Sequence, residues 1–254
     1  MEKAYIDLVL DTCLTAGKIM IESGSEMYRV EDTMHRITAN AGLADARIYT
    51  TPTGLMVGLD KTNDVQIEQI DERAIDLEKV TRVNQLSRMF ADKKITLEQL
   101  RDELEDVAVK TPAFPLWVQT LGTGVLSSTL MILFMNGYDW LDFPFAAIIG
   151  MLAFLTYHAV KKYTNIRFLS EMLASVVLAF CAIFLKKIIP SVDSDAIIIG
   201  AVMVLVPGLA LTNSLRDLFA GHLISGIARG VEAMLTAIAI GGGVGIVIKL
   251  LGVM

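Results

Sequence analysis

The sequence predicts an α-helical membrane protein, in which a five-span helical bundle follows a small α/β cytoplasmic domain. The first observation is the distribution of charge along the 254 residues. Residues 1–115 carry 14 Lys and Arg against 21 Asp and Glu, whereas residues 116–254 carry 8 against 7. The second is a hydrophobic content of 54%, above the roughly 45–50% of an ordinary soluble domain. Together they indicate one part in water and one part in lipid.

The same composition excludes several classes of protein. A net charge of −6 without long basic runs argues against nucleic-acid binding. Two cysteines, Cys13 and Cys181, are too few for a disulfide scaffold and are expected to be free thiols. The first 31 residues are too charged for a signal peptide. The N-terminal domain is therefore expected in the cytoplasm.

Residues 1–112 are expected to form the α/β domain. Apolar residues recur at helical spacing up to residue 41, and Ser23-Gly24-Ser25 is expected to divide this stretch into two helices, with Ser25 as the N-cap and Gly42 closing the second. The period then changes, which predicts strands at 46–51, 55–59 and 65–70. Helices are expected at 72–90 and 96–109, the latter opened by a capping box of Thr96 and Gln99.

Residues 113–254 are expected to form the membrane domain. A bilayer is crossed by about 20 mostly apolar residues. Five segments fit or approach this length, at 114–135, 143–160, 168–185, 196–211 and 231–251. The fourth is short and is interrupted by Pro207-Gly208. Basic residues are more frequent in the loops before the third and fifth segments, which favours a cytoplasmic N-terminal domain and an external C-terminus.

A first candidate site lies in the N-terminal domain, where charge is concentrated within two helical turns after Gly24. Its charged residues are Glu26, Arg29, Glu31 and Asp32. A solvated helix face with weak ion pairs would explain them. A binding role requires that they meet the turn between the first two strands, which offers the hydroxyls of Thr51 and Thr53 and the backbone of Gly54.

A second candidate site surrounds the interrupted fourth segment. Pro207 removes a backbone donor and disturbs the helix, and such breaks are tolerated where protein or water satisfies the freed groups. The polar residues that follow are Thr212, Asn213, Arg216, Asp217 and Arg229. Asn213 and Asp217 are four residues apart and share a helix face. A wet cytoplasmic helix and loop is the alternative interpretation.

Other motifs are few. The glycines at 241–243 and 245 predict close helix packing, with a flexible pore-lining point as the alternative. The three histidines are scattered, so no metal site is expected, and no phosphate-binding loop or dinucleotide fingerprint occurs. We therefore expect neither a cofactor nor an ATP-driven pump.

Three separated motifs resemble the threonine/serine exporter (ThrE) family. They are Ser23-Gly24-Ser25-Glu26 running into Tyr28–Met34, then Thr51-Pro52-Thr53-Gly54, then Val206-Pro207-Gly208 with Asn213, Asp217, Gly221, Gly226 and Arg229. The chain resembles the N-terminal half of that family, whose single-chain members have about twice as many spans. The resemblance implies a secondary carrier for threonine and serine, or for dicarboxylates in some split members, which a second small membrane protein completes.

The sequence therefore predicts an exporter, or exporter subunit, of small polar metabolites in the bacterial inner membrane, working by gradient-driven alternating access. Asp217, or else Glu171, is the expected proton carrier. Asn213, Thr212 and the backbone at Pro207-Gly208 are expected to hold substrate, with Arg216 or Arg229 as the counter-charge. A membrane-anchored ligand sensor is the main alternative; a membrane enzyme is disfavoured because no nucleophile–base pair is visible. The sequence leaves open whether the protein forms a homo-oligomer.

Overall fold

The computed structural model describes residues 3–59, 65–71, 73–110, 114–135, 140–164, 166 and 168–251. Glu72, where a helix is expected to begin, and Pro112, where the α/β domain is expected to end, lie outside these residues. The chain divides into two compact units. The first comprises Met1–Pro112 together with Leu209–Gly230, and the second comprises Ala113–Gly208 together with Val231–Met254. The N-terminal residues thus share a unit with a segment that follows them by almost 100 positions.

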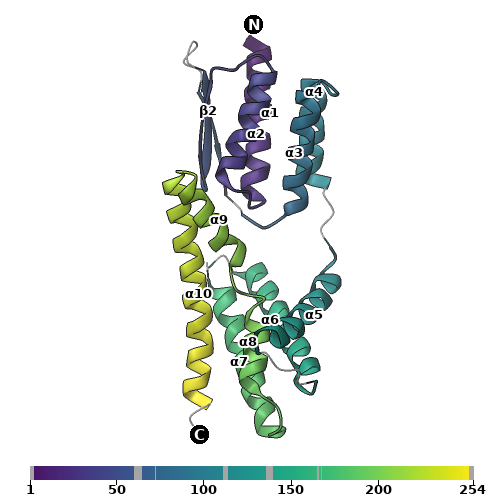
Figure 1. The fold of residues 1–254 in the computed structure, drawn as a ribbon, viewed down its shortest axis with the longest axis vertical. Coiled ribbons are helices and arrows are strands. Elements are labelled where there is room, and N and C mark those ends of the chain that lie inside the picture. The colour runs from purple at the N-terminus through teal and green to yellow at the C-terminus, as the bar shows by residue number, and fades with distance from the viewer. Residues whose placement is uncertain are drawn as a thin grey trace. The chain divides into compact units, whose positions relative to one another are not determined.

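The first unit is an antiparallel sheet packed against helices (Figure 1). Its N-terminal elements are α1 (Lys3–Glu22), α2 (Met27–Asn40), β1 (Ala46–Thr51), β2 (Gly54–Leu59), β3 (Val65–Gln69), α3 (Leu77–Ala91) and α4 (Leu97–Lys110). The strands pair in the order β1-β2-β3, with Tyr49 opposite Met56 and Met56 opposite Ile67. The predicted three strands with helices around them are confirmed.

Alternation along β2 explains how the sheet packs. Leu55, Val57 and Leu59 are buried, while Met56 between them is exposed, as a strand with one covered face requires. These strand residues join the buried apolar face of α1 in one apolar core. Apolar side chains placed at period two in the strand and at helical spacing in α1 therefore define this core.

Two predicted local signals are confirmed and one is wrong. Thr96 and Gln99 exchange hydrogen bonds as a capping box, with N···O distances of 2.9 and 3.3 Å. Gly42 has φ +87° and follows the C-cap of α2. The predicted N-cap role of Ser25 is wrong: Glu26 occupies the N-cap position, and no side chain within the loop caps the helix.

The second unit is a bundle of apolar helices. It contains α5 (Leu116–Met135), α6 (Asp142–Tyr163), α7 (Leu169–Ile188), α8 (Ser194–Val202) and the later part of α10 (Leu223–Leu251). Four helices of the described residues, α5, α6, α7 and α10, are long and apolar enough to cross a membrane. These helices are typical of a multi-pass membrane protein.

The expected fourth span, 196–211, is not one helix. Helix α8 ends at Val202, five residues without helix follow, and α9 (Gly208–Phe219) begins after Pro207. Nine residues of α8 extend about 14 Å, less than half of the roughly 30 Å of a bilayer's hydrocarbon core. Because Pro207 has no N–H to donate, the helix cannot run through it. The predicted five-span bundle is therefore corrected to four long spans plus α8.

Small residues allow close helix contact within this unit. A Cβ added to Gly150 of α6 would lie 2.6 Å from Ser127 Cβ of α5, and Ser127 Oγ donates to Ala146 O at 3.0 Å. In α10 it is Gly243 that lies against α7: a Cβ there would meet Ser175 Oγ and would be 2.6 Å from Met172 O. Gly241 and Gly245, the predicted packing pair, have nothing within 4 Å of an added Cβ in the described structure.

Gly243→Ala is expected to lower the unfolding free energy by about 1–3 kcal/mol, because the new methyl group overpacks a backbone contact. Gly241→Ala adds the same group on the same helix in open space, and its effect is expected within about 0.5 kcal/mol. Thermal denaturation of the purified full chain in detergent measures both. Equal losses of stability in the two variants would contradict the packing described for Gly243.

Candidate functional site

Polar side chains of α9 form hydrogen bonds and an ion pair with the loop between α1 and α2. Asn213 Nδ2 donates to Gly24 O at 2.9 Å, and Arg216 Nη1 lies 2.6 Å from Glu26 Oε1. Asp217 Oδ1 accepts from the backbone N–H of Met27 at 2.9 Å. Residues 213, 216 and 217 share one face of α9 because their spacing is i, i+3 and i+4. The two candidate sites of the sequence thus form one site, which we call the loop–α9 joint (residues 23–27 with 213–229).

The shape of the loop explains why its backbone is available. Gly24 adopts φ +83°, a conformation that suits glycine, and lets the chain reverse directly after α1. Ser25 N–H donates back to Met20 O at 2.9 Å and closes α1. The carbonyls of Gly24 and Ser25 remain outside both helices, and they accept from Asn213 and from Arg229 Nη2, the latter at 2.8 Å.

Asp217 supplies the cap that Ser25 was expected to provide. The first N–H groups of a helix have no partner within the helix, and a negative charge is favourable there. The carboxylate of Asp217 meets this need from 190 residues away, at Met27 N–H. Its other oxygen, Oδ2, lies 3.2 Å from Arg229 Nη1. Tertiary structure, rather than a local side chain, therefore caps α2.

Three charged side chains of the joint are buried, which is unusual for ionisable groups. The exposed fractions are 0% for Asp217, 6% for Glu26 and 7% for Arg229. A buried charge must be paired to be tolerated, and removing one member of a buried pair is strongly destabilising. Glu26 meets this condition with two arginines, since Arg29 Nη1 lies 3.3 Å from its Oε2. The joint is thus a network of opposite charges in which Glu26, Asp217 and Arg229 are buried, while Arg216 and Arg29 remain partly exposed.

The two carboxylates have pKa values shifted in opposite directions. Burial raises the pKa of Asp217 above its ordinary value; the Met27 hydrogen bond and the positive charges of Arg229 and His222 oppose this shift without cancelling it, and the charge of Glu26 adds to it. Burial also acts to raise the pKa of Glu26, but hydrogen bonds from its own backbone N–H, Arg216 and Arg29 outweigh burial and lower it. Opposite pKa shifts of this kind distinguish a carboxylate that can accept a proton from one that stays ionised.

A second contact links the joint to the sheet. Glu31 Oε1 accepts from Thr50 Oγ1 at 2.7 Å and lies 3.7 Å from His222 Nδ1. Glu31 thus reaches the strand next to the predicted turn. Within the turn, Thr51 Oγ1 donates to Gly54 O at 2.8 Å, and Thr53 O accepts from Ile70 N–H at 3.0 Å.

The remaining predicted residues lie apart from the joint's contacts. Asp32 is exposed and pairs with Arg36 on the surface of α2. Thr212 is exposed and donates to Leu209 O of its own helix. Pro207 precedes α9 and Gly208 is its first residue, where an added Cβ would meet nothing within 4 Å. Glu171 belongs to the other unit, in the first turn of α7, where Ser170 Oγ donates to it.

Sequence reasoning missed the backbone half of the joint. The groups it did not identify are Gly24 O, Ser25 O and Met27 N–H, together with the buried hydroxyl of Ser25. Backbone groups occur at every position, so no residue type marks them. It also missed Asp142, a fully buried carboxylate in the second unit that accepts from Asp193 N–H at 3.2 Å.

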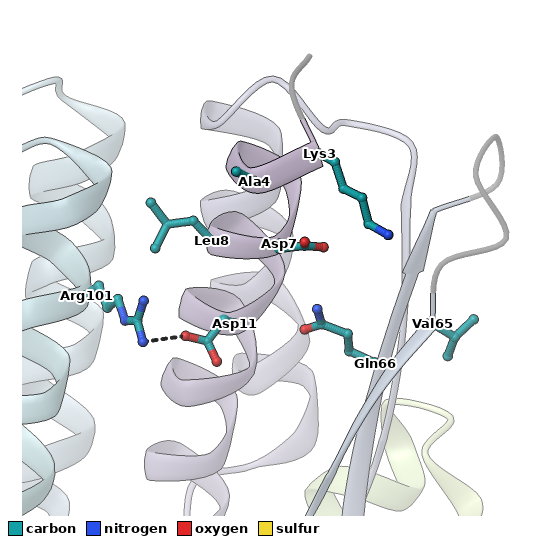
Figure 2. Close-up of a pocket in the computed structure, with 8 residues that line it drawn as sticks. All are labelled: Lys3, Ala4, Asp7, Leu8, Asp11, Val65, Gln66 and Arg101. Atoms are coloured by element: carbon teal, nitrogen blue, oxygen red, sulfur yellow. Dashed lines mark ion pairs between the residues drawn. The ribbon is translucent and has the colours of Figure 1, made fainter.

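A groove of about 740 Å³ lies elsewhere on the first unit. Figure 2 shows its lining, which comes from α1, β3 and α4 and includes the ion pair of Asp11 with Arg101 at 3.1 Å. Its charged side chains have both signs and are open to solvent. None of the predicted site residues lines it. Among the described residues, no cluster of His, Cys, Asp or Glu has the geometry of a metal site.

Comparison with known proteins identifies the family. The family described as "Putative threonine/serine exporter", ThrE, matches residues 11–251. The chain belongs to the ThrE family. That match includes α2, α9 and α10, and thus the whole loop–α9 joint. ThrE is a family of transporters, not of enzymes.

Curated relatives are distant in sequence. The chain is 22% identical to a "Probable threonine/serine exporter" of Mycobacterium tuberculosis over 96% of its length and 46% of the relative's. It is 24% identical to a "Threonine/serine exporter" of Corynebacterium glutamicum, over 95% and 51% of the two chains. It is 21% identical to a "Probable succinate transporter subunit YjjP" of Klebsiella aerogenes, over 94% and 92%.

The chain therefore spans about half the length of the two ThrE exporters and nearly all of the subunit. No solved structure matches it.

Glu26→Gln is expected to lower the unfolding free energy by about 1–2 kcal/mol at neutral pH, because charged hydrogen bonds to Arg216 and Arg29 are weakened. The pKa of Glu26 is lowered on folding, so its stabilisation is present above the ordinary value of 4.5 and is lost as the pH falls through the folded value. The melting temperatures of wild type and variant should therefore converge in acid. Glu78→Gln, which removes an exposed pair with Arg82, is the control. A difference that does not change with pH would contradict the assignment.

Proposed function

We propose that this protein is the larger, N-terminal-half subunit of a gradient-driven secondary exporter of small polar metabolites, most readily threonine and serine. Family membership and the names of two relatives support the substrate class. The transport mechanism is alternating access in the cell membrane, with the N-terminal domain in the cytoplasm. The observation that carries the proposal is the buried pair of Asp217 and Arg229 at the loop–α9 joint.

Asp217 is the proton carrier in this mechanism. A carrier must exchange a proton near physiological pH, which requires a carboxyl group with a raised pKa. Burial raises the pKa of Asp217 in this direction. Protonation removes the charge that faces Arg229 and weakens the cap on α2, so the proton alters contacts of both α9 and α10. Polar groups at such positions are functional candidates because they are costly to maintain.

The joint has a direct mechanical consequence. Helix α9 begins immediately after the Pro207 break, and α10 continues without interruption from Arg229 to Leu251. Because the α1–α2 loop is bound by residues of α9 and α10, a change in these contacts acts on both helices. Loosening of the joint on protonation is the step that we assign to the switch between access states.

A second membrane subunit completes the transporter. The chain covers about half of the two exporters but almost all of a relative that is itself named a subunit. The name of that relative also makes succinate the alternative substrate. A ligand sensor built from residues 1–112 alone is less well supported, because Leu209–Gly230 is part of the same compact unit.

Asp217→Asn is expected to abolish export, because it keeps the hydrogen-bonding shape and removes the titratable proton. The measurement is efflux of labelled threonine, serine and succinate from vesicles that contain the full chain with and without its candidate partner subunit. Glu171→Gln, in the other unit, is expected to retain export. Undiminished efflux by Asp217→Asn at normal expression would remove Asp217 from the mechanism. Loss in Glu171→Gln alone would move the proton site to α7.

A further inference from the structure

We infer that the first turn of α2, together with Arg229 and Ser25, is a binding site for a substrate carboxylate, which the side chain of Asp217 fills in the state described here. The inference rests on the proposed transport function and names the place where the transported acid is held. In this view Asp217 occupies the site as an internal substitute, and the substrate takes its place.

The contacts of Asp217 define the chemistry of the site. One carboxylate oxygen accepts from Met27 N–H at 2.9 Å, and the other lies 3.2 Å from the guanidinium of Arg229. A helix N-terminus beside an arginine is a preferred environment for an anion. Because the chain's own carboxylate is fully buried there, the site already shows that it accepts this group away from water.

The hydroxyl of Ser25 supports this carboxylate site independently of the contacts of Asp217. Its side chain is 1% exposed, and its Oγ has no hydrogen-bond partner in the described part of the chain. Buried hydroxyls are nearly always paired, so an unpaired one calls for an explanation. A carboxylate can accept about four hydrogen bonds. A free ligand can therefore use the Ser25 hydroxyl in addition to Met27 N–H and Arg229, whereas Asp217 is tethered to α9 and leaves that hydroxyl unpaired.

The chemical class follows from what the relatives' compounds share. Threonine and serine carry an ammonium group, and succinate carries a second acid, but all three carry a carboxylate. A site for this common group fits relatives with different substrates in one family. The remaining part of the substrate would then decide between amino acids and dicarboxylates.

Charge balance couples the exchange to a proton. If ionised Asp217 stayed nearby, it would share the buried surroundings of Arg229 with both the incoming carboxylate and Glu26. Uptake of one proton by Asp217 keeps the net charge unchanged when a carboxylate enters. The charged groups that face this network are Glu26, Arg29 and Glu31 from the loop and α2, Arg216 from α9, and His222 and Arg229 from the start of α10. Binding is therefore tighter at lower pH.

The test is equilibrium binding of labelled threonine and succinate to the purified full chain at about pH 6 and about pH 8. If the substrate enters only with a proton, wild-type affinity falls by up to about tenfold per pH unit above the pKa of Asp217. Asp217→Asn, which carries no charge to displace, should still bind and should lose this pH dependence. Ser25→Ala and Arg229→Lys should bind at least about threefold and about tenfold more weakly, respectively.

Controls separate the site from its alternatives. Threoninamide, which lacks the carboxylate, should not compete with threonine. Asp7→Asn alters the open groove beside α1 and should bind as wild type. Loss of binding in Asp7→Asn with normal binding by Ser25→Ala and Arg229→Lys would place the ligand in the groove and overturn the inference. Loss of all binding in a folded Asp217→Asn would also overturn it.

The two proposals can fail separately. Intact, pH-dependent carboxylate binding without efflux in any subunit combination would refute transport and leave the site standing. Normal efflux and affinity in both Ser25→Ala and Arg229→Lys would refute the site and leave transport standing. Competition of threonine against succinate distinguishes an amino-acid site from a dicarboxylate site.

Discussion

The hydrogen bond from Met27 N–H to the carboxylate of Asp217 is the interaction on which the arrangement of the first unit depends. It satisfies the start of a helix with a side chain that lies 190 residues later in the chain. Around it, the loop carbonyls accept from Asn213 and Arg229. Each of these groups would carry an energetic cost if it were buried alone. Together they make Leu209–Gly230 part of the N-terminal unit.

This interaction also ties the charged N-terminal residues of this ThrE-family chain to a segment that follows the first membrane-length helices. The buried carboxylates of Glu26 and Asp217 have pKa values shifted in opposite directions by their different partners. Two arginines favour the ionised form of Glu26, whereas burial favours the protonated form of Asp217. The same loop therefore contributes to structure, to charge balance and, in our proposal, to the recognition of an acid.

Much of the fold was predictable because its signals are local. The change from helical to alternating spacing located the three strands, and apolar runs with few charges located four long helices. The spacing of Thr96 and Gln99, three residues apart, predicted the capping box that they form. The sequence marked an interruption at Pro207-Gly208 in the fourth apolar run, but it did not show that residues 203–207 are all non-helical and separate two short helices.

For the site, the sequence by itself singled out most of the side chains that meet in the loop–α9 joint: Glu26 in one motif, and Asn213, Arg216, Asp217 and Arg229 in another. Only the tertiary structure decided that the two motifs are one site and that Asp217, rather than Ser25, caps α2. The physical reason is that a local cap can be read from spacing along the chain. A cap supplied from a distant segment depends on backbone groups that every residue possesses, and only folding selects which of them meet.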